Sequence, residues 1–210
     1  MAKKKNQKPY VQRTPKDPTH QSVGIGLEKP YTYSDISAHF WINGTPPESE
    51  EFRKLVQRGY RDWSLHVYGL VGSALHLSLQ DLRELPKCSH VIPVGSAFTL
   101  LGNGTWTGVP LLEVLKRCEV LPEAHYIAVS SYQSRQNALP YTEVLDRMLT
   151  AHAQAMLAYE VDGRPLSIEQ GAPLRLQIEI PSGLKVVKYL RSLELIADNP
   201  RTDSRLHVHA

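Results

Sequence analysis

The clearest pattern along the chain is the alternation of apolar and polar residues over short runs, which is typical of half-buried strands. Residues 63–71 and 75–79 alternate in this way on either side of a Gly72-Ser73 break, and they predict a β-pair. Further strands are expected at residues 126–130, 156–161, 174–180 and 185–196. The strand at 156–161 is followed by Asp162-Gly163, a dipeptide that favours a tight turn.

Four short helices are predicted between these strands. Their expected spans are 48–58, 78–85, 110–118 and 141–151. The second begins at a near capping box formed by Ser78 and Asp81. In the third, Leu111, Leu112 and Leu115 are expected to form the apolar face. No element is assigned to residues 88–109. Strands mixed with short helices indicate an α+β domain.

The positive charge of the chain is concentrated at its N-terminus. The 210 residues carry a net charge of +3. Residues 1–20 hold six Lys or Arg against Asp17, a net of +5, which leaves 18 basic and 20 acidic residues beyond them. Interleaved prolines and few apolar residues predict a disordered tail at 1–28, although a basic tail can also bind nucleic acid or an acidic partner. The domain is expected at 29–199, followed by a C-terminal tail at 200–210.

Several classes of protein and site are excluded by the sequence. No apolar run approaches the roughly 20 residues of a membrane helix, and no signal peptide follows the basic start, which predicts a cytoplasmic protein without a membrane partner. Cys88 and Cys118 are the only cysteines, too few for a disulfide framework or a multi-cysteine metal site. A glycine-rich phosphate loop, a nucleophile elbow and a His-Glu-x-x-His motif are all missing from the sequence.

Seven segments of the chain resemble, in order and spacing, the molybdopterin-binding domain of the sulfite oxidase family. These segments are 40–47, 63–71, 77–86, 106–111, 157–166, 171–175 and 183–189. The similarity covers residues 31–198 and is greatest to short bacterial members made of that domain alone. It implies a sulfite-oxidase-type fold of mixed β-sheets with short helices, with one molybdenum held on the dithiolene of a pterin cofactor.

The resemblance also implies an activity and partners. An oxidoreductase of this family moves two electrons and an oxygen atom between molybdenum and a small oxide substrate. The chain has no haem or flavin segment, so electrons are expected to pass through a partner protein, and nucleic acid is not an expected partner.

Five residues are candidate contacts to the cofactor. Arg175 and Lys188 stand where the family binds the cofactor phosphate, a buried anion that requires guanidinium or ammonium donors. The alternative for Arg175, and likewise for Lys188, is an exposed strand position. Lys185 either adds charge or faces water, and Asn43 either approaches the cofactor or only forms an Asn-Gly turn. Ser131 is a further candidate contact at the end of its strand.

The expected metal ligand departs from the family pattern. The family's cysteine ligand lies nine residues after the position of Lys87 and ten before that of Trp106, and both counts lead to Ser96. A serine can bind high-valent molybdenum as an alkoxide, but its hydroxyl must lose a proton of far higher pKa than a thiol. The alternative is that Ser96 only fills space. Gln170 also stands where the family often has a histidine.

Two functions therefore remain open at this point. The first is a molybdopterin-dependent oxidoreductase. The second is a non-catalytic binding or scaffold protein that kept the fold and lost the metal, which the changed residues around position 96 favour.

Overall fold

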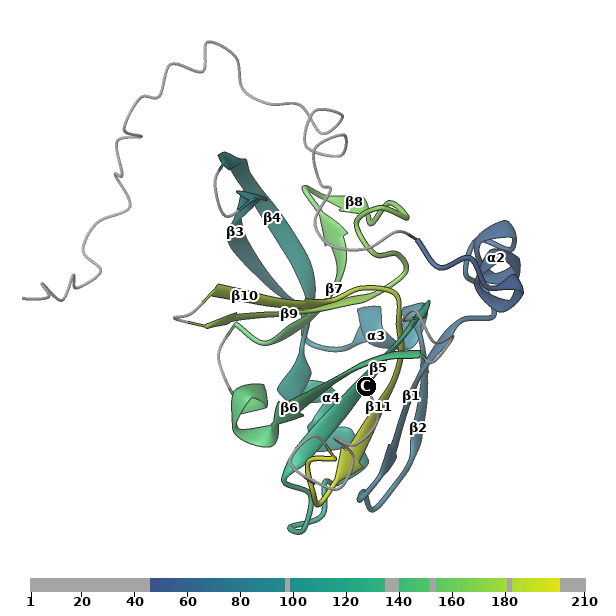
Figure 1. Ribbon diagram of the computed structural model, residues 1–210, viewed down its shortest axis with the longest axis vertical. Helices are drawn as coiled ribbons and strands as arrows, with labels where there is room; N and C mark the ends of the chain where they lie inside the picture. The colour runs from purple at the N-terminus through teal and green to yellow at the C-terminus, as the bar shows by residue number, and fades with distance from the viewer. Residues whose placement is uncertain (1–45, 97–98, 135–139, 152–153, 181–182, 201–210) are drawn as a thin grey trace, which may run out of the picture. The chain divides into compact units, whose positions relative to one another are not determined.

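Two β-sheets and a few short helices make up the described part of the chain (Figure 1). The computed structural model describes residues 46–96, 99–134, 140–151, 154–180 and 183–200. The mixed sheets and short helices agree with the predicted α+β class. Among the helices of these residues, none combines the length and the apolar character needed to cross a membrane.

The first sheet has five strands and contains the predicted β-pair. Its order is β2 (Leu75–Ser78), β1 (Ser64–Gly69), β11 (Leu190–Ile196), β5 (Tyr126–Ser134) and β6 (Pro140–Asp146). The pairing of β1 with β11 is parallel, and the other pairings are antiparallel. Leu65 lies opposite Leu77 in the predicted β1–β2 pair, which the structure confirms.

The second sheet has six strands and is antiparallel throughout. Its order is β10 (Gly183–Val187), β9 (Arg175–Ile180), β7 (Met156–Val161), β4 (Thr99–Pro110) and β3 (Cys88–Ser96), with β8 (Arg164–Pro165) beside β7. The predicted turn is confirmed, since Asp162 and Gly163 have φ angles of 50° and 73° between β7 and β8. Strands β3 and β4 were not predicted, because prolines and glycines interrupt the alternation in the stretch to which no element was assigned.

Three α-helices are described, close to their expected positions. They are α2 (Glu50–Gln57), α3 (Leu79–Glu84) and α4 (Leu111–Cys118). The predicted capping box is present in α3, with Ser78 and Asp81 each accepting from the other's backbone N–H. The predicted face of α4 is partly wrong. Leu112 is 39% exposed, while the helix buries residues at the spacing i, i+3, i+4 and i+7 that one helix face requires: Leu111, Val114, Leu115 and Cys118.

The helix expected at 141–151 is wrong. This segment forms β6 (Pro140–Asp146), followed by a 3-10 helix over Arg147–Ala151. Strand β6 pairs with β5 along most of its length, with Leu145 opposite Ile127. Tyrosine, threonine and valine in this segment suit a strand, and the pairing with β5 decides between the two structures.

The main hydrophobic core lies between the two sheets and includes the buried face of α4. A second apolar cluster covers the opposite face of the six-stranded sheet, which we call the outer face; it consists of Ile92, Trp106, Met156, Ala158, Val161, Leu166 and Ala172. Strand β9 is buried on both sides. Leu176 and Ile178 point into the main core, so the alternate residues Arg175 and Gln177 belong to the outer face.

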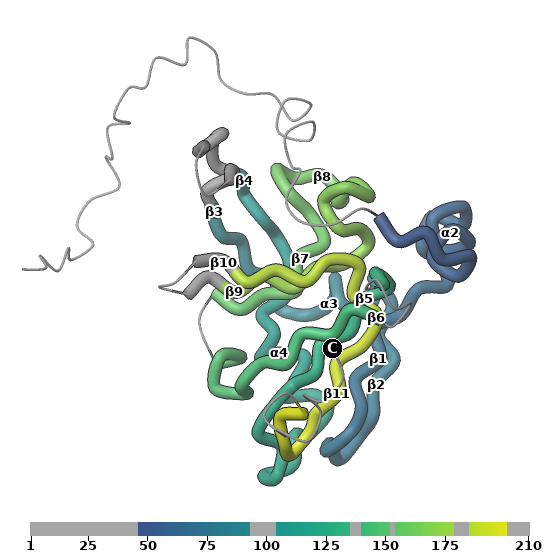
Figure 2. Tube along the Cα trace, viewed as in Figure 1, coloured from purple at the N-terminus to yellow at the C-terminus, as the bar shows by residue number. Residues whose placement is uncertain are grey.

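The chain crosses from one sheet to the other between β10 and β11. The strand-like runs expected over residues 185–196 are separated there by Lys188 and Tyr189. Tyr189 has a φ angle of +54°, a left-handed conformation that is uncommon for tyrosine. Figure 2 shows the tube of β10 passing through this bend directly into β11. We call residues 188–189 the crossover.

Candidate cofactor site

The two predicted phosphate ligands are both buried near the crossover. Arg175 begins β9 and is 3% exposed, and Lys188 lies in the crossover itself and is 6% exposed. The alternative of an exposed strand position is therefore wrong for both residues. Removing two cationic side chains from water is costly, so this site requires an electrostatic explanation.

The guanidinium of Arg175 lies over an aromatic ring and is only partly hydrogen-bonded. It stacks on the ring of Trp106, with the central carbon 4.3 Å from the ring centroid. One terminal nitrogen donates to the backbone oxygen of Gln170 at 3.0 Å, whereas the Nε of Arg175 is buried without a hydrogen-bond partner. Burial lowers the pKa of Arg175 to about 9, and Tyr189 partly opposes that shift.

The ammonium of Lys188 lies in the electrostatic field of Arg175. Its Nζ donates to the backbone oxygen of Glu169 at 2.6 Å. Burial, and then repulsion from Arg175, lower the pKa of Lys188 to about 8, and the charge of Glu169 opposes the shift. Arg175 is therefore close enough to Lys188 to affect its protonation.

Neither cation forms an ion pair with a carboxylate in the described ranges, although the charge of Glu169 acts on Lys188. The ion pairs there involve other side chains, and Arg175 and Lys188 donate to the backbone oxygens of Gln170 and Glu169. Buried charges in proteins are ordinarily paired. Two neighbouring buried cations, one with an unused N–H, therefore fit a site for an anion such as a phosphate.

Gly171 allows the backbone to approach the stem of Lys188. Its φ angle is +102°, and a Cβ placed there would lie 2.8 Å from both Cβ and Cγ of Lys188. The backbone oxygen of Gly171 also accepts from the N–H of Tyr189 at 3.3 Å. A residue with a Cβ would be strained at this φ angle and would also collide with the Lys188 side chain. Glycine is therefore required here for the crossover to lie this close to the backbone of Gly171.

Ser131 lies at the site, but its hydroxyl is occupied. The Oγ donates to the backbone oxygen of Lys188 at 2.7 Å and accepts from the N–H of Gln133 at 3.0 Å. A serine has one hydroxyl hydrogen to donate, and here it is used. Ser131 therefore anchors the backbone of the crossover.

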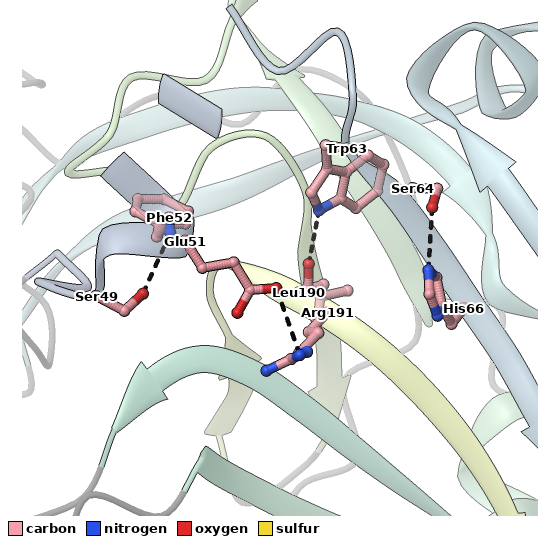
Figure 3. Close-up of polar contacts among 8 residues, drawn as sticks. All are labelled: Ser49, Glu51, Phe52, Trp63, Ser64, His66, Leu190 and Arg191. Carbon is pink, nitrogen blue, oxygen red and sulfur yellow. Dashed lines mark hydrogen bonds and ion pairs between the residues drawn. The ribbon is translucent and has the colours of Figure 1, made fainter. Parts of the chain in front are cut away.

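Contacts from Trp63 and from α2 hold the start of β11, directly after the crossover (Figure 3). The indole N–H of Trp63 donates to the backbone oxygen of Leu190 at 3.0 Å. Arg191 forms an ion pair with Glu51 of α2 at 3.4 Å. These contacts fix the residues that directly follow Lys188.

Two tyrosines at the site were not among the predicted contacts. The hydroxyl groups of Tyr60 and Tyr189 are buried without a hydrogen-bond partner. Burial, with a further contribution from Glu169, raises the pKa of each to about 12, so both remain protonated donors at neutral pH. Tyr189 directly follows Lys188 in the family-like segment and could have been suspected, but the sequence contains no comparable signal for Tyr60.

Lys185 is not brought to this site. It pairs with Ile178 of β9, whose side chain lies in the main core, and thus lies on the face of the sheet opposite Arg175. Its Nζ is 3.6 Å from a carboxylate oxygen of Glu143 on β6, and its side chain is 41% exposed. Lys185 therefore links the two sheets.

The remaining predicted residues are less fully described. Asn43 lies outside the described residues. The backbone of Ser96 pairs with Thr99 at the end of β3. The strand register places Arg175, Ala158, Gly108 and Cys88 in one row across four strands. Ser96 lies eight residues farther along β3 than Cys88, roughly 25 Å of extended chain. The register does not bring Ser96 beside Arg175, and its role as a ligand stays a prediction.

The two cysteines do not offer a thiolate in place of Ser96. The Cys118 thiol is buried in α4 and donates to the backbone oxygen of Leu115 at 3.2 Å. Burial raises the pKa of both Cys88 and Cys118. In the described segments, no three His, Cys, Asp or Glu side chains are grouped so that they could hold a metal ion.

Comparisons with known proteins identify a family for this chain. A family model described as "Oxidoreductase molybdopterin binding domain" matches residues 53–203, which include both buried cations. YuiH of Bacillus subtilis (strain 168), described as an uncharacterized oxidoreductase, is 29% identical over 86% of this chain and 85% of its own length.

Two other relatives have assigned activities. The protein-methionine-sulfoxide reductase catalytic subunit MsrP of Xanthomonas axonopodis pv. citri (strain 306) is 34% identical over 63% of this chain, and the sulfite oxidase of Arabidopsis thaliana is 27% identical over 66%. The chain spans only 40% and 43% of these two proteins.

A solved structure shows the same fold. The sulfane dehydrogenase SoxCD from Paracoccus pantotrophus matches with a TM-score of 0.53 and 20% identity, over 66% of this chain and 39% of that chain. The predicted sulfite-oxidase-type fold is thereby confirmed.

Proposed function

Since this chain belongs to the oxidoreductase molybdopterin-binding domain family, we propose that Arg175 and Lys188 hold the phosphate of its molybdopterin cofactor. The observation that carries this proposal is the burial of both cations without an ion pair to a carboxylate in the described ranges. A dianionic phosphate would supply the missing charge and would accept from the unused Nε of Arg175.

The residues of the chain have separate tasks at this site. Arg175 and Lys188 supply charge, and the hydroxyl groups of Tyr60 and Tyr189 supply neutral donors that remain protonated. Trp106 keeps the guanidinium plane fixed by stacking. When bound, a molybdenum cofactor supplies oxygen-atom and two-electron chemistry, and the protein determines its position and electrostatic surroundings.

We extend the proposal to the class of reaction. The names of the relatives include a methionine-sulfoxide reductase, a sulfite oxidase and a nitrate reductase. In the reductive direction, a small S-oxide or N-oxide would take up two electrons and two protons and release water; the oxidative direction is the reverse. A partner protein would deliver or accept the electrons. None of the comparisons favours the non-catalytic alternative.

The test is to measure molybdenum and pterin in protein purified from a molybdenum-sufficient host that makes the cofactor. The variants are Arg175→Met and, as a control, Lys185→Met. Methionine preserves apolar contact with Trp106, so Arg175→Met removes the charge with little loss of packing. We expect near-stoichiometric pterin in the wild type, at least a roughly tenfold loss in Arg175→Met because a charge-assisted hydrogen bond is lost, and no loss in Lys185→Met.

The apo proteins are compared by thermal unfolding. The melting temperature of Arg175→Met should not fall below that of the wild type, because a buried unpaired charge is removed. Retention of pterin by Arg175→Met at the wild-type ratio would refute the phosphate assignment. Wild-type protein free of both molybdenum and pterin would refute the proposed function.

A further inference from the structure

Gln177 is an unexplained buried polar residue close to the cation site. It lies on β9 two residues beyond Arg175 and is 0% exposed. Both the Oε1 and the Nε2 of its amide are buried without a hydrogen-bond partner. An amide that has lost its water and gained no partner is destabilising, so this residue needs an explanation.

The register assigns Gln177 to the same face as Arg175. It lies opposite Met156 on β7, and Arg175 lies opposite Ala158, the next residue but one. Met156 and Ala158 both belong to the apolar cluster of the outer face, whereas their neighbour Leu157 belongs to the main core. Gln177 and Arg175 therefore belong to one wall, with their Cα atoms about 7 Å apart along the strand.

We infer that Gln177 binds the pterin ring of the cofactor, so that β9 contacts two parts of one ligand. This inference rests on the proposed function. A phosphate offers acceptors alone, and it suits Arg175. A pterin has amino and ring N–H donors beside a carbonyl acceptor, and an amide is the side chain that offers one donor and one acceptor to such an edge. The apolar cluster around Gln177 provides a surface for the flat ring.

The test compares Gln177→Met and Gln177→Leu with wild type and with Ile178→Val. Ile178 is the next residue on β9 and faces the main core, so its variant controls for weakening of the strand. Each holoprotein is incubated, freed of released cofactor by gel filtration, and assayed for the remaining pterin by fluorescence after oxidation. The apo form of each variant is melted in parallel.

The two readouts are expected to move in opposite directions. Both Gln177 variants should release pterin roughly tenfold faster or more, because two hydrogen bonds to the ring are lost. Their apo forms should melt roughly 2–6 °C higher than wild type, because two unpaired polar atoms leave the interior. Ile178→Val should melt at a lower temperature and release pterin at the wild-type rate.

Three outcomes would overturn the inference. The first is pterin release by both Gln177 variants at the wild-type rate. The second is a fall in apo melting temperature with release no faster than in Ile178→Val, which would show that the amide pairs within the chain. The third is wild-type protein without pterin, which would also remove the proposed function; the first two leave the proposed function intact.

Discussion

Lys188 makes the affinity of the site for phosphate depend on pH above neutrality. Its pKa in the apo protein is about 8, against an ordinary value of 10.5. A bound dianion favours the ammonium form and restores the higher pKa, so binding above pH 8 requires uptake of a proton. Affinity should therefore fall as the pH rises through this window.

The magnitude follows from the two pKa values. Between pH 8 and pH 9, the deprotonated fraction of apo Lys188 rises enough to weaken binding by about fivefold, if Lys188 returns to 10.5 in the complex. Arg175, with a pKa of about 9, adds about a twofold loss if the dianion restores its charge in the same way. The wild type should thus lose about tenfold in affinity, and Lys188→Met, which binds more weakly at every pH, should lose only about twofold.

Isothermal titration of the apo protein with inorganic phosphate at pH 8, 8.5 and 9 measures this effect. Phosphate is already a dianion across this range. Lys185→Met is the matched control, because Lys185 lies three residues away on the opposite face, paired with Glu143. It should show the wild-type pH dependence. A wild-type affinity that does not change between pH 8 and 9, or an equal loss in Lys188→Met, would refute the assignment of Lys188.

Deprotonation of Lys188 weakens phosphate binding but increases the stability of the folded apo protein. A folded-state pKa below the unfolded value means that the apo protein gains stability as the pH rises from 8 towards 10.5. The other titrating groups contribute equally to the unfolding free energies of wild type and Lys188→Met, so their contributions cancel in the difference. It should shift by about 1 kcal/mol in favour of the wild type between pH 8 and 9.

Two further substitutions test the backbone of the site and its metal ligand. Gly171→Ala should lower the unfolding free energy by about 1–3 kcal/mol and reduce pterin retention, because its Cβ would meet the stem of Lys188. Gly163→Ala, with no atom within 4 Å of its Cβ, should leave retention unchanged, and equal retention in both variants would contradict this reading. Ser96→Cys should raise the ratio of molybdenum to pterin measured by elemental analysis, and an unchanged ratio would count against position 96 as the ligand position.

Local chemistry was sufficient to predict much of the fold. Alternation with a period of two marked β1 and β2, and the reciprocal hydrogen bonds of Ser78 and Asp81 began α3 as expected. These features depend on residues within a few positions of one another. The similarity of short segments to a family also pointed to Arg175 and Lys188, because their residue types and spacing are preserved.

The sequence by itself determined which residue types are available, and the tertiary structure decided what each can do. Pairing with β5 made a strand of residues 140–146. The register of β10 with β9 placed Lys185 on the face of the sheet opposite the cation site, whereas Lys188 lies beyond the end of β10 at that site. The burial of Arg175 and the unpaired amide of Gln177 arise from strands distant in sequence. Desolvation is a property of everything that surrounds a group, so no pattern along the chain could predict it.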